Sequence, residues 1–471
     1  MTLSPFLRLA VAVSILSLGL TPQAQTVTPQ YPIRLSSDRT YLVDQNNRPF
    51  FINGDTAWSL VVNTTNSEAT EYLQNRAAKR YNAIIVNLID TVFSAKGPNN
   101  LAGDPPFTTP NNFATPGAAY WSHVDWVLDQ ASANHIVVFA HPLYLGFQCG
   151  VEGWCQAVKN ASTTTMRAYG EFLGQRYRNQ PNLVWVIGGD ADPVAEGVEA
   201  KVMAMVNGIR AQDPGHLMTA HNIQESALNP NWATTTWINL NTVYTYGDAH
   251  QATLTEYNRD PRPIFLQETS YERDGTPESE IRRQAWWAVT SGARLGHFFG
   301  NCPIWGFDNV RSYCTAPSGG WRGQLNSPLS IQLSYVGKLF SSRAVHLLVP
   351  DQQASVMTAG VQSGSTKATT ARAKDGSSVI AYIPTRRQVT MDMDKVGGTL
   401  AHGWWFNPRT ATTTDLGTFA TSGTQNFTPP DTNDWVLVLD NASLNLGAPG
   451  TTSSGAAPPP PSAPSNLRIV K

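Results

Sequence analysis

Two acidic side chains each follow an apolar run that has the composition of a buried strand. Residues 184–187 lead through two glycines into Asp190, and residues 264–267 lead directly into Glu268. In a parallel β/α barrel, side chains at the C-terminal ends of the strands converge on one site. Hydrolysis of a glycosidic bond needs one carboxylic acid that protonates the leaving oxygen and one carboxylate that attacks the sugar or activates water. We therefore predict that Asp190 is the general acid and Glu268 the nucleophile of a glycosidase.

Strand-like runs alternate with amphipathic stretches over most of the chain, which is typical of parallel βα units. We count eight units and predict a (β/α)8 TIM barrel over residues 26–344, with Asp190 after the fourth strand and Glu268 after the seventh. The expected strands are residues 50–53, 83–88, 136–140, 183–187, 217–220, 238–243, 264–267 and 295–299. The expected helices are residues 67–80, 120–134, 163–178, 194–212, 277–291 and 327–341.

Other polar and aromatic residues follow the expected strands and are predicted to bind substrate. At the end of the first strand, Asp55 could accept hydrogen bonds from sugar hydroxyls and Trp58 could stack on a sugar ring. The remaining candidates are His141, His221, Tyr246, Asn301 and Trp305, which follow the third, fifth, sixth and eighth strands. Each has an ordinary alternative, such as a turn aspartate, a core tryptophan or a hydrogen-bonded structural histidine.

The two acids also have structural alternatives. Asp190 could cap a helix that begins near Val194, although Asp192, which precedes a proline, is the more natural cap. Glu268 could form an ion pair with Arg273 or Arg294 at the rim of the barrel. We favour the catalytic interpretation because an acid that directly ends an apolar strand is costly to place there without a use.

The composition restricts the class of partner. The chain has 471 residues, a formal net charge of −1 and only 14% charged residues, with no basic stripe of the kind that binds nucleic acid or a membrane surface. We expect a neutral carbohydrate partner and a monomer. The nine histidines are scattered without a His-Glu-x-x-His motif, so we expect neither a metal nor a cofactor. The Gly-x-Ser-x-Gly motif of serine esterases is also absent.

The N-terminus has the features of a secretory signal. Arg8 precedes a short apolar segment over residues 9–18, so we predict a signal peptide over residues 1–25 and a secreted or periplasmic protein. No later segment approaches the roughly 20 apolar residues that a membrane helix needs. Export favours disulfides among the four cysteines. Three pairings are possible, and we expect the two local ones, which join Cys149 to Cys155 and Cys302 to Cys314.

The texture of the sequence changes near Val345, where Thr, Ser and Gly become frequent and helical periodicity ends. Short alternating runs such as residues 378–383 and 435–439 predict a β-sandwich over residues 345–445. Residues 446–471 contain four consecutive prolines and are predicted to form a linker and a disordered tail.

Several segments resemble the apiosidase-like glycoside hydrolases. They are residues 53–58 (Asn-Gly-Asp-Thr-Ala-Trp), Trp185 with residues 188–190, Gln267 with Glu268, and residues 346–351 at the domain junction. The resemblance covers about residues 30–445 and implies a β/α barrel followed by a β-domain often labelled collagen-binding. It also implies release of apiose from a pectic side chain by an Asp and a Glu, which correspond to Asp190 and Glu268.

Barrels with acids after strands four and seven also resemble a large superfamily of retaining glycosidases, which leads us to expect retention. In that superfamily the strand-four acid is usually a Glu preceded by Asn, whereas here Asp190 follows Gly189. An endo-β-glucanase is the first alternative, and it would need an open cleft with exposed tryptophans in line. A non-catalytic carbohydrate-binding or adhesion protein is the second, and in it the acids would only hold sugar hydroxyls.

Overall fold

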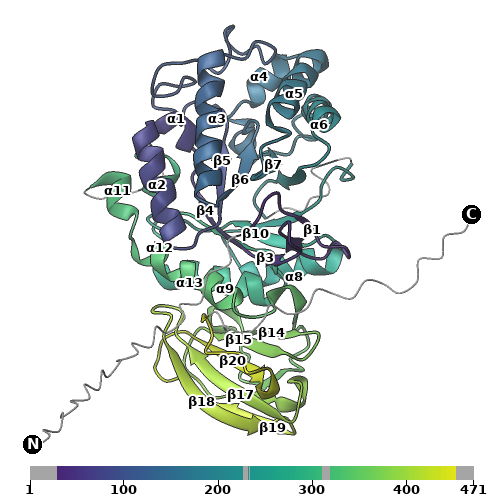
Figure 1. Ribbon diagram of the computed structural model, residues 1–471, viewed down its shortest axis with the longest axis vertical. Coiled ribbons are helices and arrows are strands. Elements are labelled where there is room, and N and C mark those ends of the chain that lie inside the picture. The colour runs from purple at the N-terminus through teal and green to yellow at the C-terminus, as the bar shows by residue number, and fades with distance from the viewer. Residues whose placement is uncertain (1–28, 226–231, 233, 310–313, 315–318, 452–471) are drawn as a thin grey trace, which may run out of the picture.

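The structure is a computed structural model that describes residues 29–225, 232, 234–309, 314 and 319–451. The expected signal peptide and the tail from residue 452 lie outside the described residues. A helix-covered barrel and a C-terminal β-rich region make up the molecule (Figure 1). None of the helices in the described part of the chain combines the length and the apolar character needed to cross a membrane.

Eight parallel strands form the barrel, as predicted. Their order is β8-β7-β6-β5-β4-β11-β10-β9, and a parallel bridge between Thr219 and Leu240 joins the two ends of this sheet. The strands are β4 (Ile52–Thr56), β5 (Ala83–Asn87), β6 (Val137–His141), β7 (Leu183–Gly188), β8 (Leu217–His221), β9 (Asn241–Tyr244), β10 (Ile264–Glu268) and β11 (Gly296–Phe299). Asp190 therefore follows the fourth barrel strand, and Glu268 ends the seventh.

Helices cover the outside of the barrel. The longer ones are α2 (Asn66–Ala78), α3 (Ala118–Ala133), α5 (Thr163–Tyr177), α6 (Glu199–Gln212), α8 (Ala249–Arg259) and α9 (Glu278–Thr290). The shorter ones are α1 (Leu60–Asn63), α4 (Cys155–Asn160), α10 (Cys302–Trp305), α11 (Gly320–Gln324), α12 (Pro328–Gln332) and α13 (Ser334–Phe340). Three expectations need correction: α6 begins at Glu199 rather than at residue 194, the expected helix 327–341 is divided into α12 and α13, and α8 was not predicted.

The first barrel strand lies later in the sequence than predicted. Pro49–Phe50 forms β3 of a small antiparallel sheet with β1 (Arg34–Leu35) and β2 (Leu42–Val43), and the barrel strand begins only at Ile52. Side chains on a strand alternate between its two faces. Ile52 and Gly54 therefore face the barrel interior, where a Cβ at Gly54 would lie 2.2 Å from the ring of Phe298. Asp55 faces outward.

Aromatic rings fill the barrel beneath the strand ends. Phe139 packs against Phe265 and Phe298 with ring centroids 5.5 and 5.0 Å apart. Leu42 and Phe50 of the small antiparallel sheet belong to the same apolar cluster. The interior is therefore a solid core that supports whatever stands at the C-terminal ends of the strands.

The C-terminal region consists of two antiparallel sheets, in agreement with the predicted β-sandwich architecture. The larger contains, in order, β12 (Leu348–Pro350), β14 (Thr369–Ala373), β15 (Ser378–Ile383), β20 (Trp435–Asn441), β17 (Leu400–Phe406) and β18 (Thr413–Ala420). The smaller contains β13 (Met357–Ala359), β16 (Val389–Asp392) and β19 (Thr424–Phe427). Val379 and Leu437 of the larger sheet share an apolar cluster with Met391 and Phe427 of the smaller one.

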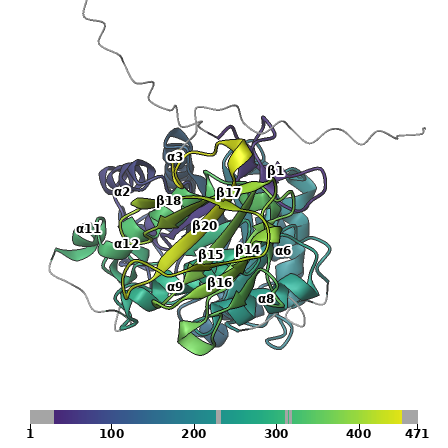
Figure 2. The same ribbon diagram turned by 90° about the horizontal axis from the view of Figure 1, so that it is seen from below.

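The other face of the larger sheet packs on the barrel, beneath α9 and α13 in Figure 1 and across the barrel in Figure 2. Trp286 of α9 stacks on Tyr382 of β15 with an interplanar angle of 6°. The Arg282 guanidinium forms an ion pair with Asp434, with Nε 2.7 Å from Oδ2. Barrel and β-region thus share an apolar core and a buried ion pair.

Candidate active site

The turn that carries Asp190 depends on two glycines. Gly188 and Gly189 have φ angles of 107° and 117°, and Asp190 itself has a φ of 48°. A Cβ at Gly188 would lie 2.5 Å from the carbonyl oxygen of His221, and one at Gly189 would lie 2.3 Å from the ring of Tyr144. Because glycine alone fits both the angles and the space, the Gly-Gly pair allows the chain to turn so that the Tyr144 hydroxyl donates to Asp190 Oδ2 at 2.7 Å.

An irregularity in strand β10 sets the direction of the Glu268 side chain. Phe265 faces the barrel interior and Leu266 packs outside against α9, so strict alternation would place Glu268 outside as well. The pairing between β9 and β10 shifts between Leu266 and Glu268, which sets Glu268 opposite Tyr244. Bulges of this kind redirect side chains next to active sites. Here the bulge brings the Glu268 carboxylate to the mouth of the barrel.

His221 lies between the two acids. Its Nε2 is 3.8 Å from Asp190 Oδ1 and 3.4 Å from Glu268 Oε2, so these two oxygens are at most about 7 Å apart, the sum of the two distances. Asp190 is 9% exposed and Glu268 is 6% exposed. The two carboxylates therefore face one small region that is largely closed to solvent.

Tyrosine hydroxyls hold Glu268 in place. Its Oε1 accepts hydrogen bonds from Tyr246 at 2.9 Å and from Tyr271 at 3.0 Å. Trp58 Nε1 in turn donates to the Tyr271 hydroxyl at 2.7 Å. The Glu268 carboxylate is therefore held in position by two hydroxyls and, through Tyr271, by Trp58.

Burial changes the proton affinity of the other groups. It raises the pKa of Asp190 to about 6, with a further rise from Glu268 and opposing effects from His221 and from the hydroxyls of Tyr144 and Tyr244. Burial lowers the pKa of His221, but the interactions with Glu268 and Asp190 outweigh it and leave the pKa above its ordinary value. Asp190 is therefore protonated at mildly acidic pH, as a general acid must be.

Aromatic and imidazole rings surround the two acids. Trp58 stacks on His221 with centroids 5.5 Å apart and meets the edge of His141 at 5.1 Å. Burial lowers the pKa of His141 well below its usual range, so this imidazole is neutral. Trp305 belongs to the same apolar cluster as Trp58 and packs edge-on against Phe93. The structure thus brings Trp58, His141, His221 and Tyr246 together beside the acids, while Trp305 lies in the same apolar cluster against Phe93.

Two residues predicted to contact sugar, Asp55 and Asn301, are buried and bound to other protein groups in this structure. Asp55 is buried on the outside of β4, where its Oδ2 pairs with Arg76 Nε at 2.5 Å and accepts from Tyr72 at 2.7 Å. Asn301 is also buried, and its Nδ2 donates to Glu272 Oε2 at 2.8 Å. Strand alternation turns Asp55 to the outside of the barrel, and Asn301 is bound to Glu272 rather than to either acid.

The structural alternatives for the acids are wrong. The backbone N–H groups of Val194 and Ala195 are bound by Asp192 Oδ1, not by Asp190. Among the described residues Glu268 forms no ion pair with an arginine, and Arg273 Nε donates to Gln324 instead. The contacts of both acids are with tyrosine hydroxyls and His221.

Tyr144 and Tyr271 are site residues that the sequence analysis missed. Each lies three residues after a strand-end residue that was singled out, namely His141 and Glu268. That position in a loop after a barrel strand was the available signal. Many loops contain a tyrosine, and contacts between loops that are distant in sequence decide which of these side chains turns back toward the strand ends.

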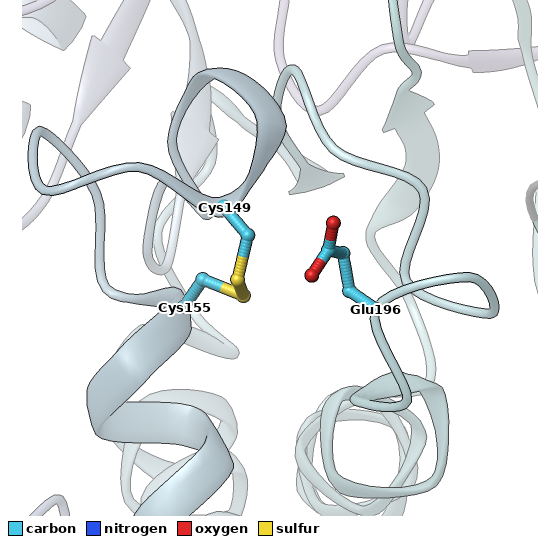
Figure 3. Close-up of side chains that lie close together, drawn as sticks. All are labelled: Cys149, Cys155 and Glu196. Atoms are coloured by element: carbon cyan, nitrogen blue, oxygen red, sulfur yellow. A yellow bond between two sulfur atoms is a disulfide. The ribbon is translucent and has the colours of Figure 1, made fainter.

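Both expected disulfides form, with Cα atoms 5.1 Å apart in Cys149–Cys155 and 5.6 Å apart in Cys302–Cys314. Figure 3 shows Glu196 facing the first disulfide, the one grouping of potential metal ligands found in the described part of the chain. Since the two sulfur atoms are bonded to each other, they offer no thiolate to a metal. Glu196 Oε2 is instead paired with Lys159 Nζ at 2.8 Å.

A family model described as "Apiosidase-like, catalytic domain" matches residues 36–346, and one described as "Putative collagen-binding domain of a collagenase" matches residues 349–440. A solved structure titled "Glycoside hydrolase" is similar with a TM-score of 0.77 at 24% identity, covering 89% of this chain and 99% of its own. A glycoside hydrolase family 5 structure from Bacteroides vulgatus ATCC 8482 has a TM-score of 0.75 at 22% identity, covering 87% and 94%. These structural likenesses concern the fold. Among curated proteins, none matches.

Proposed function

This chain belongs to the apiosidase-like family of glycoside hydrolases, and on that premise we propose that it releases a terminal apiose or related furanoside from pectic polysaccharide of plant cell walls. The observation that carries the catalytic part of the proposal is the pair of Asp190 and Glu268 around His221. In this proposal Asp190 is the general acid and Glu268 is the nucleophile.

The proposed reaction has two steps. Glu268 attacks the anomeric carbon while the Asp190 carboxylic acid gives its proton to the glycosidic oxygen, which breaks the bond to the leaving chain. The Asp190 carboxylate then takes a proton from water, and that water attacks the glycosyl ester on Glu268 and frees both the sugar and the enzyme. His221, with its raised pKa, offsets the negative charge that lies on Glu268 before the first step and on Asp190 between the two steps.

The spacing of the acids supports retention of configuration. Retaining glycosidases hold the two carboxyl groups about 5 Å apart and inverting ones about 6.5–9.5 Å apart. The distances of Asp190 and Glu268 to His221 limit the separation of their facing oxygens to at most about 7 Å. This limit allows the spacing of retaining enzymes and excludes most of the range of inverting ones.

The burial of the acids favours removal of a terminal sugar over cleavage within a polymer. An endo-acting enzyme needs an open cleft that exposes several tryptophans, and no tryptophan is among the exposed large apolar side chains of the described residues. Trp58, which stacks on His221, is nearly buried, and so is Trp305. Such a site suits one small ring at the end of a chain.

The proposal is tested with pectic side-chain oligosaccharides and a panel of aryl glycosides, with the released sugar identified by chromatography. We expect the wild type to release apiose or a related pentose, and Asp190→Asn and Glu268→Gln to release none. Asp192→Asn and Glu278→Gln are matched controls, since both remove an acid outside the site. Binding of every oligosaccharide without hydrolysis by any protein would favour a carbohydrate-binding protein instead.

We also propose that the protein is exported and monomeric. The support for export is the pair of disulfides, which persist in oxidising compartments and are rare in the cytosol. N-terminal sequencing of protein recovered outside the cytoplasm is expected to begin after about residue 25. Recovery of the complete N-terminus from the cytoplasm would contradict export, and a dimer in light scattering would contradict the monomer.

A further inference from the structure

Residues 144–155, here called the acid-side loop, are fastened to the turn that carries Asp190. Leu145 N donates to the Gly188 carbonyl at 3.2 Å, and Gln148 N donates to the Asp190 carbonyl at 2.8 Å. The Tyr144 hydroxyl binds the Asp190 carboxylate itself. Because three contacts join them, this loop and the general acid form one unit.

The loop is also closed on itself. Trp154 N donates to the Tyr144 carbonyl at 2.8 Å, and Cys155 N donates to the Leu145 carbonyl at 3.1 Å. The disulfide between Cys149 and Cys155 adds a covalent tie from the middle of the loop to its C-terminal end (Figure 3). A loop held in this way presents its tip in a fixed position beside the acid.

The tip of the acid-side loop exposes two apolar side chains, Phe147 at 50% and Val151 at 79%. Phe147 directly precedes Gln148, whose N–H binds the Asp190 carbonyl. A general acid must contact the glycosidic oxygen, so the part of the substrate that leaves passes on the acid's side. An exposed aromatic ring in this position can pack against the apolar face of a sugar.

A cavity of about 520 Å³ adjoins the same loop. Val151 and Trp154 form part of its wall, and the polar part of its lining includes Asn111, Asn112, Gln156, Asn160, Ser162 and Thr165. No lining residue is charged. Amides and hydroxyls without charge are the groups that exchange hydrogen bonds with neutral sugar hydroxyls.

A second cavity differs from this one in that charged side chains line it. It has a volume of about 890 Å³ and lies between α2 and α11, where Glu71 and Arg322 face it. These two side chains are paired with each other, with Arg322 Nε 2.9 Å from Glu71 Oε2. It shares no residue with the acid-side loop, so of these two cavities it is the 520 Å³ one that adjoins the loop.

We propose that Phe147 and the 520 Å³ cavity form the binding surface for the leaving side of the substrate, and that this side is a neutral oligosaccharide. The inference rests on the proposed function, because the direction of the leaving chain follows from the role of Asp190. Phe147 packs against the sugar next to the cleaved bond, and the amide-lined cavity binds sugars further along the chain.

Binding is the direct test, and it does not depend on turnover. Calorimetry with the Glu268→Gln protein uses galactotetraose and arabinotetraose as neutral probes and trigalacturonic acid as the charged comparison. Added Phe147→Ala is expected to weaken the binding of a neutral probe about tenfold, and added Asn160→Ala about threefold. Leu400→Ala removes an exposed apolar side chain of the β-region and is the matched control.

The outcomes separate this inference from the proposed function. The proposed leaving-side surface would be overturned by any of three results. The neutral probes do not bind, they bind no more tightly than trigalacturonic acid, or they bind equally to the loop variants and to the control. Absence of sugar release by the wild type, measured separately, would overturn the proposed function alone. Circular dichroism verifies that the variants are folded, which is expected because Phe147 and Asn160 are both exposed.

Discussion

At the residue scale, two carboxylates on either side of one histidine have different surroundings. Glu268 Oε1 accepts hydrogen bonds from the hydroxyls of Tyr246 and Tyr271. Asp190 is buried and has its pKa raised to about 6. A buried carboxyl group that keeps its proton at mildly acidic pH suits a general acid, and on this ground we propose Asp190 as the acid and Glu268 as the nucleophile.

The pH dependence follows from the pKa of Asp190. Since Asp190 must hold a proton to act as acid, kcat/KM is expected to fall as the pH rises through about 6. The hydrogen bond from Tyr144 lowers this pKa, so Tyr144→Phe is expected to move the alkaline limb to higher pH as well as lower the rate. Tyr335→Phe, on α13, is the control. A limb that does not move would contradict the role of Tyr144.

The same burial affects stability. With the pKa of Asp190 raised, the folded state binds this proton more tightly than the unfolded state, so the penalty is absent below about pH 4 and complete above about pH 6. Asp190→Asn is expected to raise the free energy of unfolding by roughly 1–3 kcal/mol at pH 8 and by little at pH 4. Urea unfolding at the two pH values measures this. Equal effects at both pH values would contradict it.

At the element scale, the sequence allowed the ends of the barrel strands to be predicted. It allowed the directions of the side chains at those ends to be predicted only in part. Continuous apolar runs placed the barrel strands, and with them most of the residues now found around the acids. Asp55 lies inside β4 rather than after it, because the barrel strand begins at Ile52 instead of residue 50, and strand alternation turns its side chain outward to Arg76. Helix α8 was missed because its buried face consists of Ala249, His250, Thr253 and Glu256, which show no apolar periodicity. The bulge before Glu268 has no local sequence signal.

The Cys149–Cys155 disulfide is expected to matter more for activity than for stability. Loop-closure entropy gives about 2 kcal/mol for its six-residue separation and about 3 kcal/mol for the twelve-residue separation of Cys302–Cys314. Replacing Cys149 and Cys155 by Ser is nevertheless expected to lower kcat at least about tenfold, because the acid-side loop holds Asp190. The Cys302/Cys314 double replacement is the comparison. Losses of kcat that only follow the losses of stability would refute a positioning role.

At the scale of the whole molecule, the barrel and the β-region depend on each other. The change of composition near Val345 could be read from the sequence. The contacts across the junction could not, since Arg282 and Asp434 are 152 residues apart and neither lies in a motif. Trp286 and Tyr382 likewise meet only because α9 packs on the larger sheet.

Replacement of Asp434 tests whether the stability of the barrel and that of the β-region depend on each other. Asp434→Ala leaves the buried Arg282 guanidinium and the Tyr382 hydroxyl without this acceptor. Breaking a buried ion pair from one side costs about 3–5 kcal/mol, and we expect both regions to unfold together in one transition. Calorimetry of the full chain measures this, with the exposed Asp394→Ala as control. Two separate transitions, of which only the β-region's moves, would contradict a shared core.

The most direct test of the central claim compares leaving groups. The kcat/KM of the wild type, Asp190→Asn and Glu268→Gln is measured on the best oligosaccharide and on an aryl glycoside with an activated leaving group that needs no proton. We predict that Glu268→Gln is inactive on both, whereas Asp190→Asn loses at least about a thousandfold on the oligosaccharide and far less on the aryl glycoside. Near wild-type rates for either variant on both substrates, or the reverse pattern, would contradict the assignment of Asp190 as acid and Glu268 as nucleophile.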